Sequence, residues 1–407
     1  MEVFPNLTLF LLFFLSGLQN SFAFLFGLEE SLNLLNEDGK LNFTELAAKY
    51  GFPNAVTKDV VTDDGYILAL HHIPGDKRKP VLLVHGNTVD ACCWIIRGNS
   101  SLAIKLARKG YDVWAINSRG TTLSKRHLFL NANTQMREFY NYTFYEQGIY
   151  DMPATIDYIL EETKQKSLLA IGHSIGTTNF YVLGSVKPEY NDKIKAFISL
   201  APISFIQNLR GLARVGSLLG NALTDVGLLI GEEEIAGKNE LLSGVFNATC
   251  LGPLRYTVCV KGVLFPLFGP DARGLERDFV RTLFGHFPEG SSRKLFDHLI
   301  QIIERNKFAN YDYGWEGNLA EYGTEEPPEF DLSQVSMNMA LLVGSNDYLA
   351  SVPDAERLRD DLPNVVHYQV MPYEDFNHID FVWGREMPSN LYLYLMPVIE
   401  KYMKPKN

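Results

Sequence analysis

The sequence predicts an α/β fold in which a mostly parallel central sheet carries helices on both faces and a helical cap is inserted late in the chain. Three observations lead to this class. Short apolar runs alternate with helical patterns from about residue 80 to residue 200, which is typical of a parallel sheet. The alternation stops over residues 203–332, where helical patterns dominate. Strand signals resume at 339–343 and 366–371.

The first elements are a helix around residues 43–50 and a hairpin. Two runs at 59–62 and 66–72 flank the turn residues Asp63-Asp64-Gly65. Continuous apolar runs, which suit strands buried on both faces, are then expected at residues 80–84, 111–116, 168–171 and 196–200. Helices are expected at residues 101–108, 153–164, 177–185, 294–303 and 392–402.

Composition limits the classes of protein that the chain could be. Of its 407 residues, 46% are hydrophobic and 21% are charged, which excludes a disordered chain. The net charge of −11 argues against a nucleic-acid partner, because such a partner favours a basic face. We therefore expect one core domain made of residues 24–202 and 333–407, with residues 203–332 as the inserted cap.

Residues 1–23 are interpreted as a cleaved signal peptide. Residues 7–18 form an uncharged apolar run too short to span a bilayer comfortably, and Ser21-Phe22-Ala23 offers small residues at a cleavage site. Because no Lys or Arg precedes the run, a buried N-terminal helix or a retained anchor stays open as the alternative. No later segment is apolar and long enough for a transmembrane span, so a secreted or lysosomal protein is expected.

Two further patterns suit an oxidising compartment. Cys250 and Cys259 are spaced for a small disulfide-closed loop, whereas the adjacent Cys92 and Cys93 are expected to be packed thiols. The acceptor pattern for N-glycosylation, Asn-x-Ser/Thr, occurs in the mature chain at Asn42, Asn99, Asn141 and Asn247.

The candidate nucleophile is Ser174, in Gly172-His173-Ser174-Ile175-Gly176. This Gly-x-Ser-x-Gly pattern lies between a predicted strand and a predicted helix. A sharp turn at such a junction exposes the serine hydroxyl at the carboxyl edge of the sheet, and glycines leave room for the chain to pass. The alternative interpretation is a glycine-rich turn with a solvated serine.

A serine hydroxyl needs a base, and His378 is the candidate among the nine histidines. It follows the last predicted strand in a loop, where it could reach over the serine. Asp347, which follows the strand at 339–343, is expected to orient it, and Asp354 farther along is a rival. The order Ser174, Asp347, His378 is that of the α/β-hydrolases. A surface histidine and a surface aspartate remain the simpler alternatives.

The transition state of ester hydrolysis carries an oxyanion that needs preorganised donors. One is expected to be the backbone N–H of Ile175, just after the serine. The other is expected to be the backbone N–H of Asn87, after His85-Gly86. This chemistry needs neither a metal nor an organic cofactor.

Taken together, these residues resemble the acid lipase family of the α/β-hydrolases, which includes gastric and lysosomal acid lipases and insect lipases. The resemblance runs from about residue 54 to 402. It is carried by Val84-His85-Gly86, Gly110–Trp114, Asn117–Gly120, Asp151–Asp157, the Ser174 turn, Asn346-Asp347 and Asn377–Gly384.

The resemblance implies Ser174, Asp347 and His378 as a catalytic triad, a helical lid, and a disulfide between Cys250 and Cys259. It also implies a water-insoluble ester substrate, either an acylglycerol or a sterol ester, met at a lipid–water interface.

The chain departs from the family pattern in two places beside the expected oxyanion donors. Ile175 stands where the family usually has Gln, and Asn87-Thr88 stands where it usually has two leucines. The adjacent Cys92 and Cys93 are also unusual. Two other functions therefore stay open: a non-catalytic lipid carrier or yolk-like storage protein, and a carboxylesterase of short-chain esters.

Overall fold

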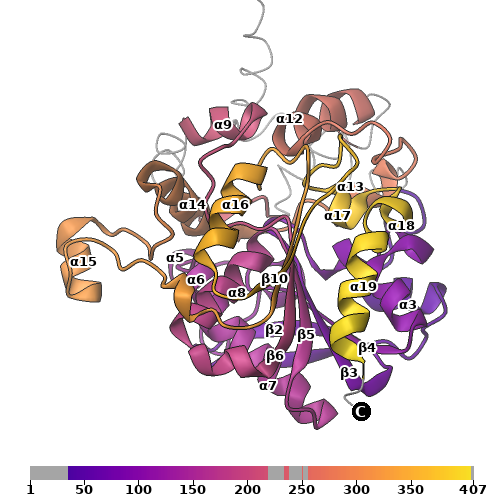
Figure 1. The fold of residues 1–407 in the computed structure, drawn as a ribbon, viewed down its shortest axis with the longest axis horizontal. Coiled ribbons are helices and arrows are strands. Elements are labelled where there is room, and N and C mark those ends of the chain that lie inside the picture. Colours follow the sequence, from indigo (N-terminus) through magenta and orange to yellow (C-terminus); the bar gives the residue numbers. More distant parts are fainter. Residues whose placement is uncertain (1–34, 219–232, 238–249, 251–254, 405–407) are drawn as a thin grey trace, which may run out of the picture.

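The computed structural model describes residues 35–218, 233–237, 250 and 255–404 (Figure 1). An eight-stranded sheet forms its centre, with the order β1-β2-β4-β3-β5-β6-β9-β10. The strands are β1 (Val56–Val61), β2 (Ile67–Ile73), β3 (Asp76–Val84), β4 (Tyr111–Ile116), β5 (Leu168–His173), β6 (Ile194–Leu200), β9 (Met339–Val343) and β10 (Val365–Val370).

The sheet is mostly parallel, as predicted. β2 pairs antiparallel with β1 and β4, and the remaining neighbours run parallel. Every residue of β4, β5 and β9 is buried. These strands have continuous apolar sequences because helices cover both faces of the sheet.

Helices follow the strands in alternation. The main ones are α3 (Phe43–Lys49), α4 (Leu102–Arg108), α7 (Met152–Thr163), α8 (Ile175–Val186), α16 (Val352–Asp361) and α19 (Tyr392–Met403). Figure 1 shows α8 and α16 on one side of the sheet and α19 on the other. The predicted fold class is confirmed.

Between β6 and β9 the described chain is largely helical. It contains α9 (Gly211–Leu218), a π-helix (Tyr256–Leu264), α12 (Phe265–Phe268), α13 (Val280–His286), α14 (Arg293–Arg305) and α15 (Gly314–Tyr322). In Figure 1, α9 and α12 lie beyond the upper end of the sheet. The division into a core and a cap at residues 203 and 332 stays a prediction.

One expectation for this region is wrong. No strand is expected between residues 203 and 332, but β7 (Glu234–Ile235) and β8 (Ser291–Ser292) pair antiparallel. Two residues are too few to show an alternating pattern, so the sequence holds no signal for them.

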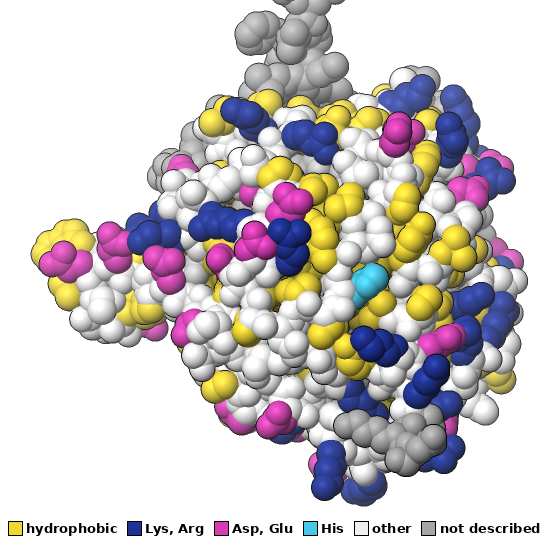
Figure 2. Space-filling model, in the orientation of Figure 1, with side chains coloured by type: hydrophobic (Ala, Val, Ile, Leu, Met, Phe, Trp, Pro, Cys, Tyr) yellow, Lys and Arg dark blue, Asp and Glu magenta, His cyan; other side chains and the backbone are white. Residues whose placement is uncertain are grey.

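α15 projects from the body as an arm (Figure 1). The space-filling view shows apolar and acidic side chains on it (Figure 2). Trp315, with 64% of its surface exposed, is the most exposed of its large apolar residues. None of the helices in the described ranges combines the length and apolar character that a bilayer span requires.

Candidate active site

The turn between β5 and α8 holds Ser174 in an uncommon backbone conformation, with φ 54° and ψ −126°. The chain passes closely on both sides of it. A Cβ on Gly172 would lie 2.6 Å from the Gly176 carbonyl oxygen, and one on Gly176 would lie 2.4 Å from the Val84 carbonyl oxygen. Both glycines are therefore required by the approach of neighbouring backbone, and the strained serine is fixed by its surroundings.

A continuous hydrogen-bonded chain joins Ser174, His378 and Asp347. His378 Nε2 lies 2.9 Å from Ser174 Oγ, and His378 Nδ1 lies 2.8 Å from Asp347 Oδ2. All three residues are buried. Since the carboxylate can only accept, Nδ1 carries the proton and Nε2 is left free to accept the serine hydroxyl proton. This geometry is that of a nucleophile, a base and an orienting acid.

Asp347 is held by the backbone that follows it. Its Oδ1 accepts hydrogen bonds from the N–H groups of Leu349 and Ala350, each at 2.8 Å. Its other oxygen is thereby aimed at His378. The rival, Asp354, lies in the first turn of α16 and accepts from the Asn208 amide and the Ser351 hydroxyl instead.

The loop carrying His378 is fixed from both sides. His173 Nε2 lies 2.9 Å from the His378 carbonyl oxygen and donates to it. The Phe268 ring, at the end of α12, stacks on the His378 imidazole with centroids 5.7 Å apart. Burial lowers the pKa of His173 to about 3, so its ring stays neutral.

The loop after β3 passes directly beside the serine. A Cβ on Gly86 would lie 3.0 Å from Ser174 Cβ. Ser118 N–H donates to His85 Nε2 at 3.0 Å, so the ring proton is on Nδ1, which donates to the Gly86 carbonyl oxygen at 2.7 Å. In a trans peptide the C=O and the following N–H point in opposite directions. His85 therefore sets the direction of the Asn87 N–H.

Asn87 and Ile175 line one small pocket beside the serine. The loop and the helix start that carry the two expected oxyanion donors are thus brought together. Both donors are backbone groups, so the departures from the family pattern leave them in place and change only the side chains around them.

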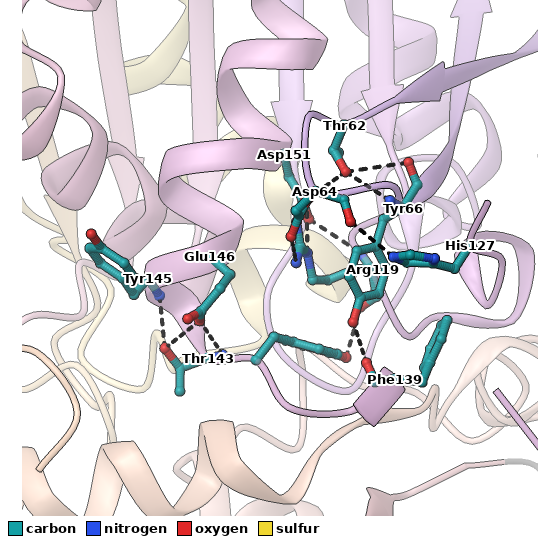
Figure 3. Close-up of polar contacts among 11 residues, drawn as sticks. Thr62, Asp64, Tyr66, Arg119, His127, Phe139, Thr143, Tyr145, Glu146 and Asp151 are labelled. Atoms are coloured by element: carbon teal, nitrogen blue, oxygen red, sulfur yellow. Dashed lines mark hydrogen bonds and ion pairs between the residues drawn. The ribbon is translucent and has the colours of Figure 1, made fainter. Parts of the chain in front are cut away.

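A buried ion-pair cluster holds the elements around the site (Figure 3). The Arg119 guanidinium pairs with Asp64 from the β1–β2 turn at 2.6 Å and with Asp151 before α7 at 2.6 Å. It also lies over the Tyr66 ring, 4.0 Å from the centroid. Burial raises the pKa of Asp151 to about 6, and Arg119 opposes that rise.

The remaining candidate residues fall into three groups. Asn42, Asn99 and Asn141 are exposed, and Asn247 lies outside the described residues, as do residues 1–23. A disulfide joins Cys250 to Cys259. Cys92 and Cys93 are buried thiols, as predicted.

Comparison with known proteins identifies the family. A model of the α/β-hydrolase fold matches residues 79–215, and a model of the partial α/β-hydrolase lipase region matches residues 43–98. Lipase 1 of Drosophila melanogaster is 34% identical over 90% of this chain and 81% of its own. The chain belongs to the acid lipase family of the α/β-hydrolases.

A second relative agrees with this acid lipase assignment, which makes the protein a serine ester hydrolase. The rat lysosomal acid lipase/cholesteryl ester hydrolase is 30% identical over 91% of this chain and 94% of its own. A soluble variant of the monoglyceride lipase of Saccharomyces cerevisiae shares the fold, with a TM-score of 0.53 at 15% identity, over 86% of this chain and 97% of that one.

Sequence reasoning missed the residues that hold the site. It named His85 and His173 only as a strand end and a neighbour of the serine, and it gave Arg119 no role. Their contacts join positions far apart in the chain: His173 and His378 are 205 residues apart, and Arg119 and Asp151 are 32 apart. The one available signal was that His85, Arg119, Asp151 and His173 all lie in segments that resemble the family.

Proposed function

We propose that this acid lipase hydrolyses the carboxylic ester bonds of neutral lipids, triacylglycerols or sterol esters, through Ser174, His378 and Asp347. The observation that carries the proposal is the hydrogen-bonded chain from Ser174 Oγ through the imidazole to Asp347, with 2.9 Å and 2.8 Å at its two links. The name of the rat relative, lysosomal acid lipase/cholesteryl ester hydrolase, refers to one of these lipid classes.

In the proposed reaction the Ser174 oxygen attacks the ester carbonyl carbon while His378 Nε2 takes the hydroxyl proton. The backbone N–H groups of Asn87 and Ile175 stabilise the oxyanion that forms. His378 then gives the proton to the leaving alcohol oxygen, and the acyl group stays on Ser174. Water, activated by the same imidazole, releases the acid and regenerates the serine.

Asp347 acts in this scheme by stabilising the imidazolium. It is fully buried and its second oxygen is occupied by two backbone N–H groups. A buried carboxylate held in this way keeps one orientation through both steps, so the imidazole does not need to reorient between them.

The protein is proposed to be secreted or lysosomal and to act at a lipid–water interface. The apolar run and small residues of positions 1–23 support export. The exposed acceptor asparagines Asn42, Asn99 and Asn141 and the Cys250–Cys259 disulfide suit an oxidising compartment.

A fluorophosphonate probe tests the nucleophile. We expect the probe to label the parent protein and not Ser174→Ala, and we expect hydrolysis of emulsified triolein and cholesteryl oleate to disappear in the same variant. Ser345→Ala is the matched control, because Ser345 lies on the loop beside Asp347 and donates to the Tyr373 carbonyl. A parent that is neither labelled nor active would favour the lipid-carrier alternative.

Acyl chain length separates a lipase from a short-chain carboxylesterase. Rates on tributyrin and triolein should be compared below and above the solubility limit of each ester. A lipase gains activity when the interface forms. A rate that is highest on the soluble short ester and unchanged by the interface would support the carboxylesterase instead.

A further inference from the structure

The oxyanion loop, residues 86–89, carries the proposed donor of Asn87 past the serine. Thr88 in this loop has φ 55°, which is rare for a β-branched residue. A residue with a Cβ is strained in this left-handed region, and it persists where surrounding contacts enforce it. The Thr88 N–H donates to Asn87 Oδ1 at 3.1 Å. That bond lies within the loop, so it does not fix the loop on the rest of the protein.

Glu289 supplies a contact from outside the oxyanion loop. It lies between α13 and β8, and its backbone N–H donates to the Thr88 carbonyl oxygen at 2.8 Å. The direction of that carbonyl depends on the φ and ψ angles of Thr88. The bond from Glu289 therefore holds Thr88 in its strained conformation.

The Glu289 side chain is bound to a third part of the chain. It is buried, and its Oε2 accepts from the Thr122 N–H at 2.9 Å and from the Thr122 hydroxyl at 2.6 Å. Thr122 begins a short 3-10 helix after β4. Hydrogen bonds to a carboxylate are stronger than those between neutral groups, and two of them restrict its position. The side chain thereby fixes the position of its own backbone N–H.

A small movement of the oxyanion loop reaches the serine. A Cβ on Gly86 would lie 3.0 Å from Ser174 Cβ, so the two segments are in close contact. An oxyanion donor must also lie within about 2.7–3.1 Å of the oxygen that it stabilises. A loop that leaves the strained conformation of Thr88 would move the Asn87 N–H away from such a position.

We propose that Glu289 is a positioning residue for the oxyanion loop. Its carboxylate, anchored on Thr122, places its backbone N–H against the Thr88 carbonyl. Thr88 is thereby held at positive φ, with the Asn87 N–H beside Ser174. The proposal rests on the proposed function, since it concerns the donor to the oxyanion formed there.

The first test compares Glu289→Ala with Glu289→Gln on a soluble short-chain ester. The value of kcat is expressed per site titrated to completion with the fluorophosphonate, which leaves out unfolded molecules. Glu289→Ala should lower kcat about 10- to 100-fold with KM little changed, less than the loss of a whole oxyanion donor. Glu289→Gln keeps an oxygen that can accept from both Thr122 groups, so it should retain most of the parent kcat.

The second test asks whether Glu289 acts through the conformation of Thr88. Glycine adopts positive φ without strain, whereas alanine does not. The fall in kcat caused by Glu289→Ala should therefore be smaller when Thr88 is replaced by Gly than in the parent. Thr88→Ala is the matched control, because it removes the same side chain but keeps the Cβ, and the fall should remain large. A role of Glu289 in overall stability alone would give equal falls in the two backgrounds.

Thr122→Val carries the test if Glu289→Ala does not fold. It removes only the hydroxyl donor to Glu289 and should lower kcat about 3- to 10-fold, the value of one hydrogen bond. This fall should again be smaller with Thr88→Gly than with Thr88→Ala.

Four results overturn the proposal: a parent-like kcat in Glu289→Ala, a parent-like kcat in Thr122→Val, equal falls in the two Thr88 backgrounds, or a Glu289→Gln variant as slow as Glu289→Ala. These outcomes differ from failure of the proposed function, in which the parent does not hydrolyse the ester and Ser174 is not labelled by the fluorophosphonate.

Discussion

His173 Nε2 donates a hydrogen bond to the backbone carbonyl of His378 at 2.9 Å, so the residue before Ser174 holds the main chain of His378. This bond joins the end of β5 to the loop after β10, where the Ser174 hydroxyl meets the His378 imidazole. Because the pKa of His173 is lowered to about 3 by burial, the neutral ring keeps this role in acidic solution.

Replacing His173 should therefore lower kcat more than it changes KM. His173→Leu removes the donor to the His378 carbonyl, and a single lost hydrogen bond corresponds to a fall of about 3- to 10-fold in kcat. The rate of labelling by a fluorophosphonate should fall in parallel, since it depends on the same alignment. His173→Gln, which can donate from its amide, should recover part of both. A fall confined to KM would contradict a positioning role.

His85 is expected to matter through the oxyanion. His85→Ala frees the Gly86 carbonyl, so the Asn87 N–H loses its fixed direction. Loss of one oxyanion-hole donor costs about 10²–10³ in kcat. Steady-state kinetics on a soluble ester measure this loss in kcat, and thermal unfolding shows whether the variant is folded.

The variant His85→Asn tests whether the hydrogen bond to the Gly86 carbonyl is what sets the direction of the Asn87 N–H. An Asn amide can donate to the Gly86 carbonyl, so activity should return in part if the bond itself is what matters. If His85→Asn and His85→Ala lose activity equally while both remain folded, the direction of the Asn87 N–H is set by something else.

Asp380, which lies beside Asp271 and two residues after His378, is expected to make the stability of the fold depend on pH. Both carboxyl groups are buried. Burial, and then the neighbouring Asp271 charge, raise the pKa of Asp380 well above its usual range, while Arg97 opposes the rise. Tyr373 donates to Asp271 at 3.1 Å, and Arg97 bonds the Gly274 carbonyl beside the pair.

An acid whose folded-state pKa is raised stabilises the fold below its unfolded pKa of about 3.9, and that stability is lost as the pH rises through the folded pKa. Asp380→Asn removes the need for a proton. We expect its melting temperature to fall less than that of the parent as the pH is raised from about 4 towards 8. The exposed Asp375→Asn is the control and should follow the parent. Parallel curves for Asp380→Asn and the parent would show that Asp380 does not titrate in this range.

The strands of the sheet could be predicted because burial on both faces leaves continuous apolar runs. β4 has the predicted bounds, 111–116. β3 begins at Asp76 rather than at residue 80, because its first residues are polar and mostly outside the core and so lack that pattern. α8 begins at Ile175, two residues before its predicted start, since the serine turn itself caps the helix.

The three side chains of the hydrogen-bonded chain could be named in advance because each follows a strand in a fixed order, and parallel strands bring their carboxyl ends to one edge. Their catalytic role stays a prediction. The bonds that hold them could not be foreseen. A contact such as Arg119 to Asp64 depends on where two loops meet in space, and neither residue type nor spacing records it.

Arg119 supplies the last prediction, which concerns stability. The fully buried guanidinium keeps its charge, so Asp151→Asn leaves it with Asp64 alone. Asp64 still balances the charge, so the expected cost is that of the lost hydrogen bonds to a charged group, about 1.5–3 kcal/mol. Denaturant unfolding should show this loss for Asp151→Asn. The double variant Asp151→Asn/Arg119→Met should regain part of it, because the charge is removed as well. A loss below about 1 kcal/mol in the single variant would show that the cluster does not hold the elements around the site.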